Sequence, residues 1–241
     1  GLSQGSIDQS ALVLRQFYAD IRLQDTQITP RILRAWLYAY PKAHPTRSGA
    51  PVSEHTLSNK RLILLGYFEW AANNGYIPTN PCRAVAKIRY AKPCRRQLTE
   101  EQLAQLRYAA ETDKERALLE VLYSSGCRVS ELCRLNISDV CLQDRSVHLF
   151  GKGRKHRTSY ISAAAVIALR YYLNGRTDHN PALFVTRRGL RCTPDGIRAL
   201  IHRLGGRVDM AALHPHLLRH TMATHAVNAG MPIQEVSALL G

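Results

Sequence analysis

The sequence predicts a mainly α-helical protein of two domains, with a small antiparallel β-sheet in the second domain. Helical patterning fills residues 1–90, where no convincing strand pattern is present. In residues 98–241, helical segments accompany two short strand-like runs that flank a glycine-containing turn. Between these regions, residues 91–97 are basic, contain Pro93 and lack an apolar period, which is typical of a linker.

The first domain, residues 1–90, is expected to be helical throughout. We place its helices at residues 9–24, 31–40 and 53–74, with a short helix after Pro81. Ser53 can cap the start of the third helix. Four apolar side chains of this helix fall near one stripe, namely Leu57, Leu62, Leu65 and Phe68. Lys60 and Arg61 lie outside that stripe, as does Arg47 in the segment before it.

The second domain, residues 98–241, is expected to combine helices with a β-hairpin. We place helices at residues 99–110, 114–124, 129–135, 162–173, 194–204, 215–229 and 232–240. Two strands, at 147–150 and 158–161, are joined by the turn at 151–156. In the last helix, Ile233, Val236 and Leu240 form an apolar stripe that we expect to pack on the core.

Positive charge is spread over both domains. The chain has 33 Lys and Arg against 18 Asp and Glu, a net charge of +15; residues 1–90 carry +6 and residues 91–241 carry +9. Two basic folded regions favour an extended polyanion as partner, most simply nucleic acid, although a basic protein without such a partner is the alternative. The sequence has no apolar run long enough to span a bilayer and no signal segment, so we expect a cytoplasmic protein.

The six cysteines indicate neither a disulfide framework nor a zinc site. None forms a C-x-x-C pair, so reduced thiols are expected. The spacings between Cys127, Cys133 and Cys141 match no known zinc-ligand pattern.

Three clusters of polar residues could carry chemistry. In residues 126–132, Arg128 opens a helix and Glu131 follows one turn later, so the carboxylate can hold the guanidinium group; a surface salt bridge is the alternative. In residues 151–157, two glycines flank Lys152 at a turn that could expose its amine to a phosphate, unless the hairpin is simply solvated. These two clusters supply an arginine and a lysine.

The third cluster is residues 214–220. On a helix, His216, Arg219 and His220 share one face. The two histidines could suggest zinc, but Leu217 stands where the H-E-x-x-H pattern needs glutamate. Together the clusters offer arginines, a lysine and histidine with few carboxylates. That inventory fits a phosphoryl transition state stabilised by fixed guanidinium groups better than a two-metal nuclease, which would need several carboxylates.

The same three runs, 123–132, 151–157 and 214–220, together resemble the tyrosine recombinase (phage integrase) family, particularly its Xer-like members. The resemblance covers residues 98 to 241 and extends more loosely to residues 1–90, as a helical core-binding DNA-binding domain. It implies catalytic roles for Arg128, Lys152, His216 and Arg219, with Glu131 and His220 in support. The implied reaction cuts and rejoins DNA at a recombination site through a 3′-phosphotyrosyl intermediate, without metal, ATP or another cofactor.

Double-stranded DNA is therefore the expected partner, held in a C-shaped clamp of the two domains. We expect phosphate contacts from nine further basic residues: Arg47, Lys60, Arg61, Lys92, Arg95, Arg96, Arg154, Lys155 and Arg157. The resemblance further implies a homotetramer on DNA for the full-length protein and a location in the cytoplasm with the nucleoid.

The nucleophile is where the chain departs from this pattern. The family's tyrosine would follow about ten residues beyond the Leu-Leu-Gly at 239–241, whereas the last tyrosine here is Tyr172. We therefore expect a truncated catalytic domain whose nucleophile lies beyond Gly241, and a monomeric chain that binds DNA without cleaving it. A non-catalytic DNA-binding protein on the same fold is the main alternative, and a metal-dependent nuclease is a third.

Overall fold

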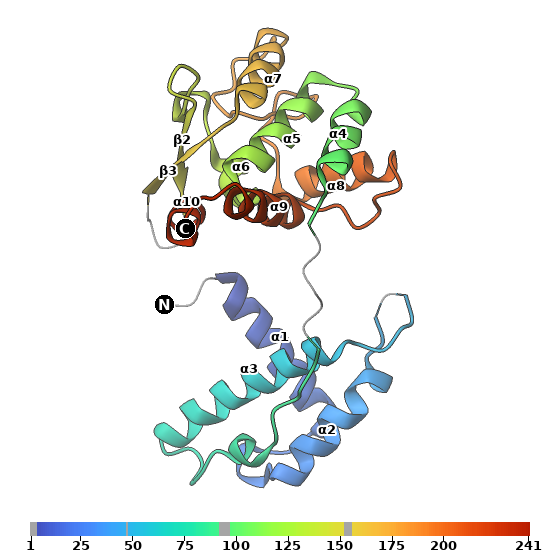
Figure 1. The fold of residues 1–241 in the computed structure, drawn as a ribbon. Helices are drawn as coiled ribbons and strands as arrows, with labels where there is room; N and C mark the ends of the chain where they lie inside the picture. The colour runs from blue at the N-terminus through green and yellow to red at the C-terminus, as the bar shows by residue number, and fades with distance from the viewer. Residues whose placement is uncertain (1–3, 47, 92–96, 152–155) are drawn as a thin grey trace. The chain divides into compact units, whose positions relative to one another are not determined.

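The computed structural model describes residues 4–46, 48–91, 97–151 and 156–241 (Figure 1). The chain divides into two compact units, Gly1–Cys94 and Arg95–Gly241, which we call the first and second units. The division falls inside residues 91–97, the segment with linker composition. Each unit has its own apolar core. The described residues are mainly helical with one small antiparallel sheet, so the predicted fold class is confirmed.

The first unit is built around an aromatic centre. Its elements are α1 (Gln4–Ile21), the 3₁₀ turn η1 (Asp25–Gln27), α2 (Pro30–Ala43), α3 (Glu54–Asn73) and the 3₁₀ turn η2 (Pro81–Ala84). Phe17 of α1 is fully buried, and its ring meets Trp36 of α2 at 5.1 Å and Phe68 of α3 at 6.1 Å, both edge to face. This packing joins the three helices through their apolar faces.

The buried face of α3 differs from the predicted stripe. Its buried residues are Lys60, Arg61, Leu64, Phe68 and Ala71. Leu62, placed on the stripe from sequence, is 54% exposed. A helix turns 3.6 residues at a time, so Phe68 shares a face with Leu64 and Lys60, and not with Leu62. The prediction placed Leu62 in the core because it is apolar. The buried face of α3 instead includes two basic residues, Lys60 and Arg61, which a search for apolar positions passes over.

Lys60 and Arg61 are consequently enclosed in the first unit. The Lys60 ammonium donates to Gln16 Oε1 at 3.0 Å and lies over the Tyr40 ring, 4.3 Å from its centroid. The Arg61 Nε donates to the Val85 carbonyl oxygen at 3.0 Å. Their burial contradicts the prediction that these two residues contact DNA, because both cationic groups already have partners inside the protein.

The described residues of the second unit form seven helices and one sheet. The helices are α4 (Glu100–Ala109), α5 (Asp113–Ser125), α6 (Val129–Arg134), α7 (Ala163–Asn174), α8 (Pro194–Gly206), α9 (Pro215–Asn228) and α10 (Ile233–Leu240). Strands β1 (Val140–Cys141), β2 (Ser146–Phe150) and β3 (His156–Tyr160) form an antiparallel sheet in the order β1-β2-β3, and the 3₁₀ turn η3 (Ile137–Asp139) precedes β1. The β2–β3 hairpin was predicted; β1, two residues long, is too short to leave an alternating pattern.

Helix α5 is the centre of this unit. It packs against α7, α8 and α9, and its residues Leu118, Val121 and Leu122 are fully buried. It ends at Gly126, which has a left-handed backbone with φ of 57°. A Cβ at Gly126 would collide with the Met222 side chain and lie 2.8 Å from Leu240 Cδ2. Only glycine therefore permits the sharp turn that starts α6 directly after α5.

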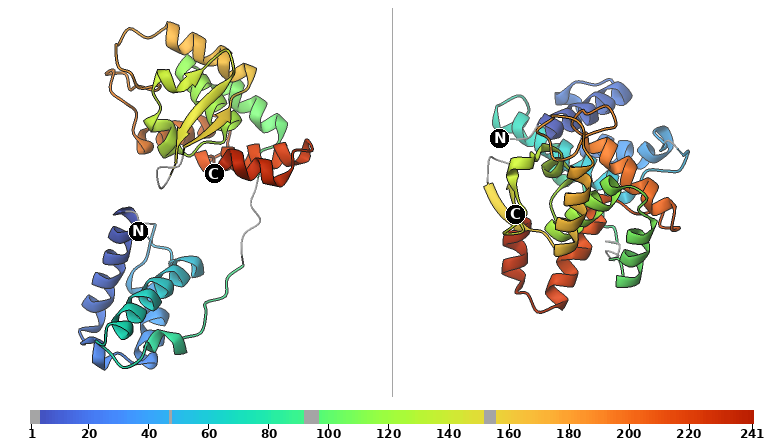
Figure 2. Two further views of the ribbon diagram at one scale, coloured as in Figure 1. Left: turned by 90° about the vertical axis from the view of Figure 1, so that its left-hand side faces the viewer. Right: turned by 90° about the horizontal axis from the view of Figure 1, so that it is seen from above.

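Helix α10 lies beside α9 and β3 (Figures 1 and 2). Val236 is buried there, and Leu240 is partly buried. Ile233 is 68% exposed, so the predicted packing of Ile233 on the core is wrong. The C-terminal turn of α10 also receives hydrogen bonds from arginines of the same unit, which end on backbone oxygens of Leu239, Leu240 and Gly241. Among the described residues, no helix is long and apolar enough to cross a membrane.

The burial of Arg61 generates a stability prediction. Replacing Arg61 by alanine should lower the free energy of unfolding of the first unit by about 3 kcal/mol, because the Val85 carbonyl oxygen loses its donor and a void remains. Both tryptophans, Trp36 and Trp70, lie in this unit, so their fluorescence in a urea titration reports on it alone. The matched control is Arg34→Ala on the exposed face of α2, which should change stability by less than about 0.5 kcal/mol. Equal effects would contradict the structural role of Arg61.

Candidate active site

Arg128 is held by the turn that joins α5 to α6. It is the N-cap residue of α6, and its backbone N–H donates to Glu131 Oε2 at 2.8 Å. Its Nη1 donates to Glu131 Oε1 at 3.0 Å. One carboxylate thus satisfies a free backbone donor at the helix start and anchors the guanidinium group. The contact that the spacing of Arg128 and Glu131 predicted is present.

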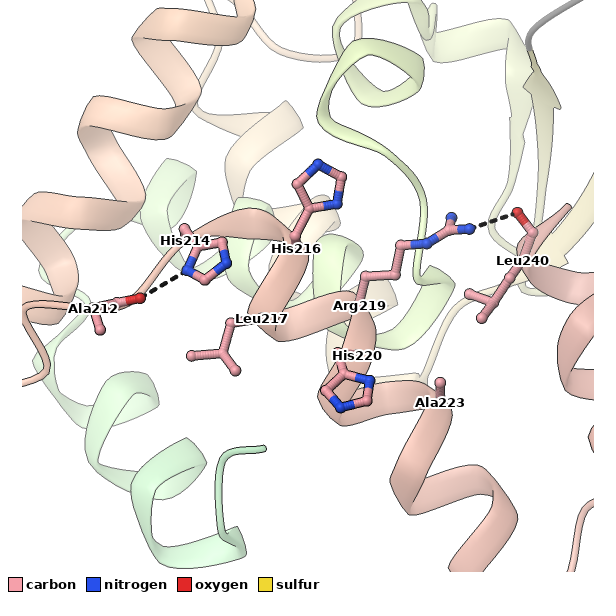
Figure 3. Close-up of a pocket in the computed structure, with 8 residues that line it drawn as sticks. All are labelled: Ala212, His214, His216, Leu217, Arg219, His220, Ala223 and Leu240. Atoms are coloured by element: carbon pink, nitrogen blue, oxygen red, sulfur yellow. Dashed lines mark hydrogen bonds between the residues drawn. The ribbon is translucent and has the colours of Figure 1, made fainter. Parts of the chain in front are cut away.

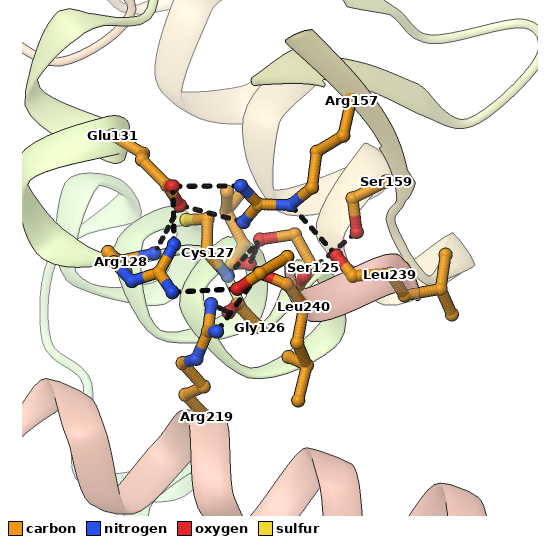
Figure 4. Close-up of polar contacts among 12 residues, drawn as sticks. Ser125, Gly126, Cys127, Arg128, Glu131, Arg157, Ser159, Arg219, Leu239 and Leu240 are labelled. Carbon is orange, nitrogen blue, oxygen red and sulfur yellow. Dashed lines mark hydrogen bonds and ion pairs between the residues drawn. The ribbon is translucent and has the colours of Figure 1, made fainter. Parts of the chain in front are cut away.

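Arg157 reaches the same carboxylate from β3. Its Nη1 and Nη2 each donate to one Glu131 oxygen at 2.8 Å, and its Nε donates to the Leu239 carbonyl oxygen at 2.9 Å. The Arg157 side chain is only 12% exposed. This burial contradicts the prediction that Arg157 contacts DNA, because its guanidinium group is enclosed between Glu131 and the end of α10 (Figure 4).

Glu131 is a buried, ionised carboxylate. Its side chain is 2% exposed. Burial by itself would raise its pKa, but the hydrogen bonds from Arg157 and from the Arg128 backbone and side chain outweigh burial and lower the pKa to about 2. At neutral pH the carboxylate therefore carries a full charge, and it has cationic partners on both of its oxygens.

Arg219 brings a third guanidinium group to this place from α9. Its Nη1 donates to the Gly126 carbonyl oxygen at 2.6 Å, and its Nη2 donates to the Leu240 carbonyl oxygen at 3.0 Å. Arg128 Nη2 likewise donates to the Gly241 backbone oxygen at 2.7 Å. Figure 4 shows the guanidinium groups gathered around Glu131 and the end of α10, a helix terminus that carries negative partial charge.

The three arginines and the one glutamate leave a net charge of +2 at this place. The Arg219 guanidinium group is partly buried and lies among like charges, so burial, followed by the nearby Arg128, lowers its pKa. A guanidinium group has five N–H donors, and the contacts above use two on Arg128 and two on Arg219. The remaining donors can bind an anion, and phosphate matches their planar geometry.

His216 lies beside Arg219 in a hollow of about 670 Å³ (Figure 3). His214 holds the N-cap position of α9 without a capping hydrogen bond from its side chain, and Pro215 starts the helix. His216 then lies one turn before Arg219 on the same face. Burial lowers the pKa of His216, and the neighbouring His214 and Arg219 lower it further. The imidazole is therefore neutral at neutral pH and can accept or donate one proton. His220, one turn further along the helix, lines the same hollow.

The structure thus brings Arg128, at the start of α6, together with His216 and Arg219, at the start of α9, although 88 and 91 positions separate them from Arg128 in sequence. Lys152, the fourth residue of the predicted catalytic set, lies outside the described residues. The same holds for six of the predicted DNA contacts: Arg47, Lys92, Arg95, Arg96, Arg154 and Lys155. The sequence analysis did not predict that Arg157 pairs with Glu131. Glu131 is a rare carboxylate among the basic residues of the three clusters, and this could have indicated that it pairs with more than one of them.

Among the described residues, neither the Cys127 thiol nor a tyrosine hydroxyl is placed as a nucleophile at this site. Burial raises the pKa of Cys127 to about 11, so its thiol is protonated and inert. The Tyr123 hydroxyl bonds His225 Nδ1 at 2.9 Å, and the Tyr172 hydroxyl accepts from the Val185 N–H. Among the described residues, which include all eleven tyrosines, no tyrosine hydroxyl is hydrogen bonded to Arg128, His216 or Arg219. Within those same residues, no cluster of three or more His, Cys, Asp or Glu side chains could hold a metal ion.

The site gathers fixed cations whose geometry suits a phosphate group, and comparison with known proteins identifies the family. Residues 96–241 match the phage integrase family. Tyrosine recombinase XerC of Haemophilus ducreyi is 30% identical to this chain over 239 residues, which cover 95% of this chain and 76% of the relative. XerC of Bacillus subtilis is 35% identical over 207 residues, covering 79% and 67%.

Solved structures agree with this in fold. The integrase of the Tn1549 transposon, in complex with circular intermediate DNA, superposes with a TM-score of 0.81 at 18% identity and covers 100% of this chain and 87% of its own. The chain belongs to the phage integrase family, the enzymes known as tyrosine recombinases or integrases.

The lowered pKa of Glu131 predicts how stability depends on pH. A carboxyl group whose pKa is lower in the folded state stabilises the fold above its unfolded pKa, near 4.5, and this contribution is lost as the pH falls toward about 2. We expect Glu131→Gln to lower the stability of the second unit by on the order of 3 kcal/mol at about pH 6. The difference between the two proteins should shrink steadily as the pH is lowered.

Urea unfolding followed by circular dichroism measures this effect, and tryptophan fluorescence of the first unit serves as an internal control that the substitution leaves unchanged. A stability difference that is independent of pH between about pH 6 and pH 3 would show that Glu131 is not the paired carboxylate described above.

Proposed function

We propose that this protein is a site-specific DNA recombinase or integrase that cuts and rejoins duplex DNA through a 3′-phosphotyrosyl intermediate. One observation carries the proposal: Arg128, Arg219 and His216 meet at one place where a single, fully paired carboxylate leaves a net positive charge. Membership of the phage integrase family and the DNA complex of the Tn1549 integrase support DNA as the partner.

In the proposed reaction, a tyrosine oxygen attacks the phosphorus atom and the bond from phosphorus to the 5′-oxygen breaks. The unused donors of Arg128 and Arg219 bind the non-bridging oxygens, where a second negative charge joins that of the diester in the pentavalent state. Their net charge of +2 suits that dianion. The neutral imidazole of His216 accepts the proton of the attacking tyrosine hydroxyl, and Lys152 protonates the leaving 5′-oxygen. Because the phosphotyrosyl bond retains the energy of the broken ester, rejoining is the reverse of cleavage and needs no ATP.

The two domains have different roles in this proposal. Residues 1–90 act as a core-binding domain and residues 98–241 as the catalytic domain, so that both basic units contact one duplex. Arg47, Lys92, Arg95, Arg96, Arg154 and Lys155 contribute phosphate contacts. The full-length protein assembles as a homotetramer on DNA in the cytoplasm with the nucleoid.

One feature favours a second candidate, a DNA-binding protein of this fold that does no chemistry. The backbone oxygens of Leu240 and Gly241 occupy donors of the arginines that would bind the phosphate. We prefer the enzyme, because most donors of Arg128 and Arg219 have no partner among the residues that the structure describes, and because the XerC relatives are named recombinases.

The proposal predicts DNA binding that depends steeply on salt. The affinity of the 241-residue chain for a labelled duplex should fall at least about tenfold between about 50 and 200 mM NaCl, since each phosphate contact releases counterions. Fluorescence anisotropy measures the change. An affinity that stays constant over this range would exclude an interface built on phosphate contacts.

The proposal also predicts where cleavage stops. With a nicked duplex that traps the intermediate, the 241-residue chain should give no covalent protein–DNA band. The reason is that none of its tyrosine hydroxyls is hydrogen bonded to Arg128, His216 or Arg219. A chain that continues past Gly241 to a tyrosine should give the band, with or without a chelator. Replacing Arg128 or Arg219 by alanine in that longer chain should slow band formation roughly 10²–10³-fold.

Arg116→Ala is the matched control, since Arg116 lies on α5 and pairs with Asp113 on the protein surface. A band from the 241-residue chain, mapped to one of its own tyrosines, would overturn the placement of the site. Cleavage that disappears with the chelator would favour a metal-dependent nuclease instead.

A further inference from the structure

Arg157 connects three elements that converge on the phosphate site. It sits in β3, where it pairs with Leu149 of β2, and its guanidinium group grips both oxygens of Glu131 in α6. Its Nε holds the Leu239 carbonyl oxygen in the last turn of α10. The Arg157 side chain also lies against Gly241, where an added Cβ would stand 3.0 Å from Arg157 Cδ.

These contacts leave Arg157 no access to a substrate phosphate. Three of its five donors are committed inside the protein, and its side chain is almost buried. A buried ion pair is a weak source of net stability, since removing two charges from water costs about as much as their attraction returns. The two-oxygen grip does, however, fix the Glu131 carboxylate in one orientation, which a single hydrogen bond would not do.

That orientation decides where Arg128 lies. Glu131 Oε1 accepts from both Arg157 Nη1 and Arg128 Nη1, so one oxygen links the two guanidinium groups. Through Leu239, Arg157 also holds the turn whose next two residues, Leu240 and Gly241, receive hydrogen bonds from Arg219 and Arg128. A shift of Arg157 would therefore displace both arginines that face the phosphate (Figure 4).

We propose that Arg157 is a positioning residue for the recombinase reaction: through Glu131 and the last turn of α10 it sets the placement of Arg128 and Arg219. The inference rests on the proposed function for its effect on cleavage, but its structural half can be tested without cleavage. Lysine at position 157 keeps the charge and loses the two-oxygen grip, so Arg157→Lys isolates the geometry.

The matched control is Arg176→Ala. Arg176 is also a buried arginine of the second unit, and it binds Asp178 and the carbonyl oxygens of Ala182 and Asn180, away from the site. Both variants remove buried arginine contacts, so both should lower stability. Only the Arg157 variant should affect the reaction.

In the longer chain that carries the nucleophile, cleavage is followed in a single turnover at saturating DNA, below the unfolding temperature of each variant. Arg157→Lys should slow cleavage about tenfold to 10²-fold with an unchanged Kd for DNA, because small misplacements of catalytic groups act on the rate. Combined with Glu131→Gln, it should add little further loss, since both changes break the same link. Arg176→Ala should cleave at the normal rate. A normal rate for Arg157→Lys, or losses that multiply in the double variant, would overturn the proposal.

A second measurement uses the 241-residue chain and needs no cleavage. The Nε–Hε NMR signal of Arg128, assigned from its loss in Arg128→Lys, should move or broaden in Arg157→Lys and stay unchanged in Arg176→Ala. An unmoved Arg128 signal would overturn the positioning role whatever the longer chain does. A moved signal together with a longer wild-type chain that never forms the covalent band would support the positioning of Arg128 and overturn the recombinase function alone.

Discussion

The site depends on one buried carboxylate placed among guanidinium groups. Glu131 closes the first turn of α6, holds Arg128 and receives Arg157 from the hairpin. Without it, the positive charges would repel one another in a region with little solvent to screen them. With it, they are close enough to act on one phosphate and still leave an excess of positive charge. The hydrogen bonds from these arginines favour the charged carboxylate, so they lower the pKa of Glu131 and stabilise the folded state at neutral pH.

The C-terminal turn of α10 adds neutral oxygens where more carboxylates would cancel the charge. The peptide carbonyl groups of Leu239 and Leu240 receive hydrogen bonds from two different arginines, Arg157 and Arg219. Such dipoles orient a guanidinium group and stabilise its charge without neutralising it. The site can therefore be well ordered before an anion arrives, which is the condition for electrostatic stabilisation of a transition state.

Basic residues in this protein serve two different purposes, and composition does not distinguish them. Arg61 and Arg157 are enclosed by backbone oxygens and a carboxylate, whereas Arg128 and Arg219 keep donors free for a partner. The total charge of +15 therefore overstates the number of cations available to DNA. Burial decides, because a guanidinium group that has left water needs protein partners for its donors.

The sequence by itself determined the fold class, most helices, the hairpin and the cluster residues, because capping residues, a glycine turn and the spacing of Arg128 and Glu131 act over a few neighbouring positions. Their order along the chain was also enough to indicate the family. Only the tertiary structure decided that Lys60 lies in the seam of α3, that Ile233 is exposed and that Arg157 faces Glu131. Each of those outcomes depends on contacts with groups distant in sequence, such as Gln16 or Leu239. Local sequence patterns do not determine which distant residue packs against a given side chain.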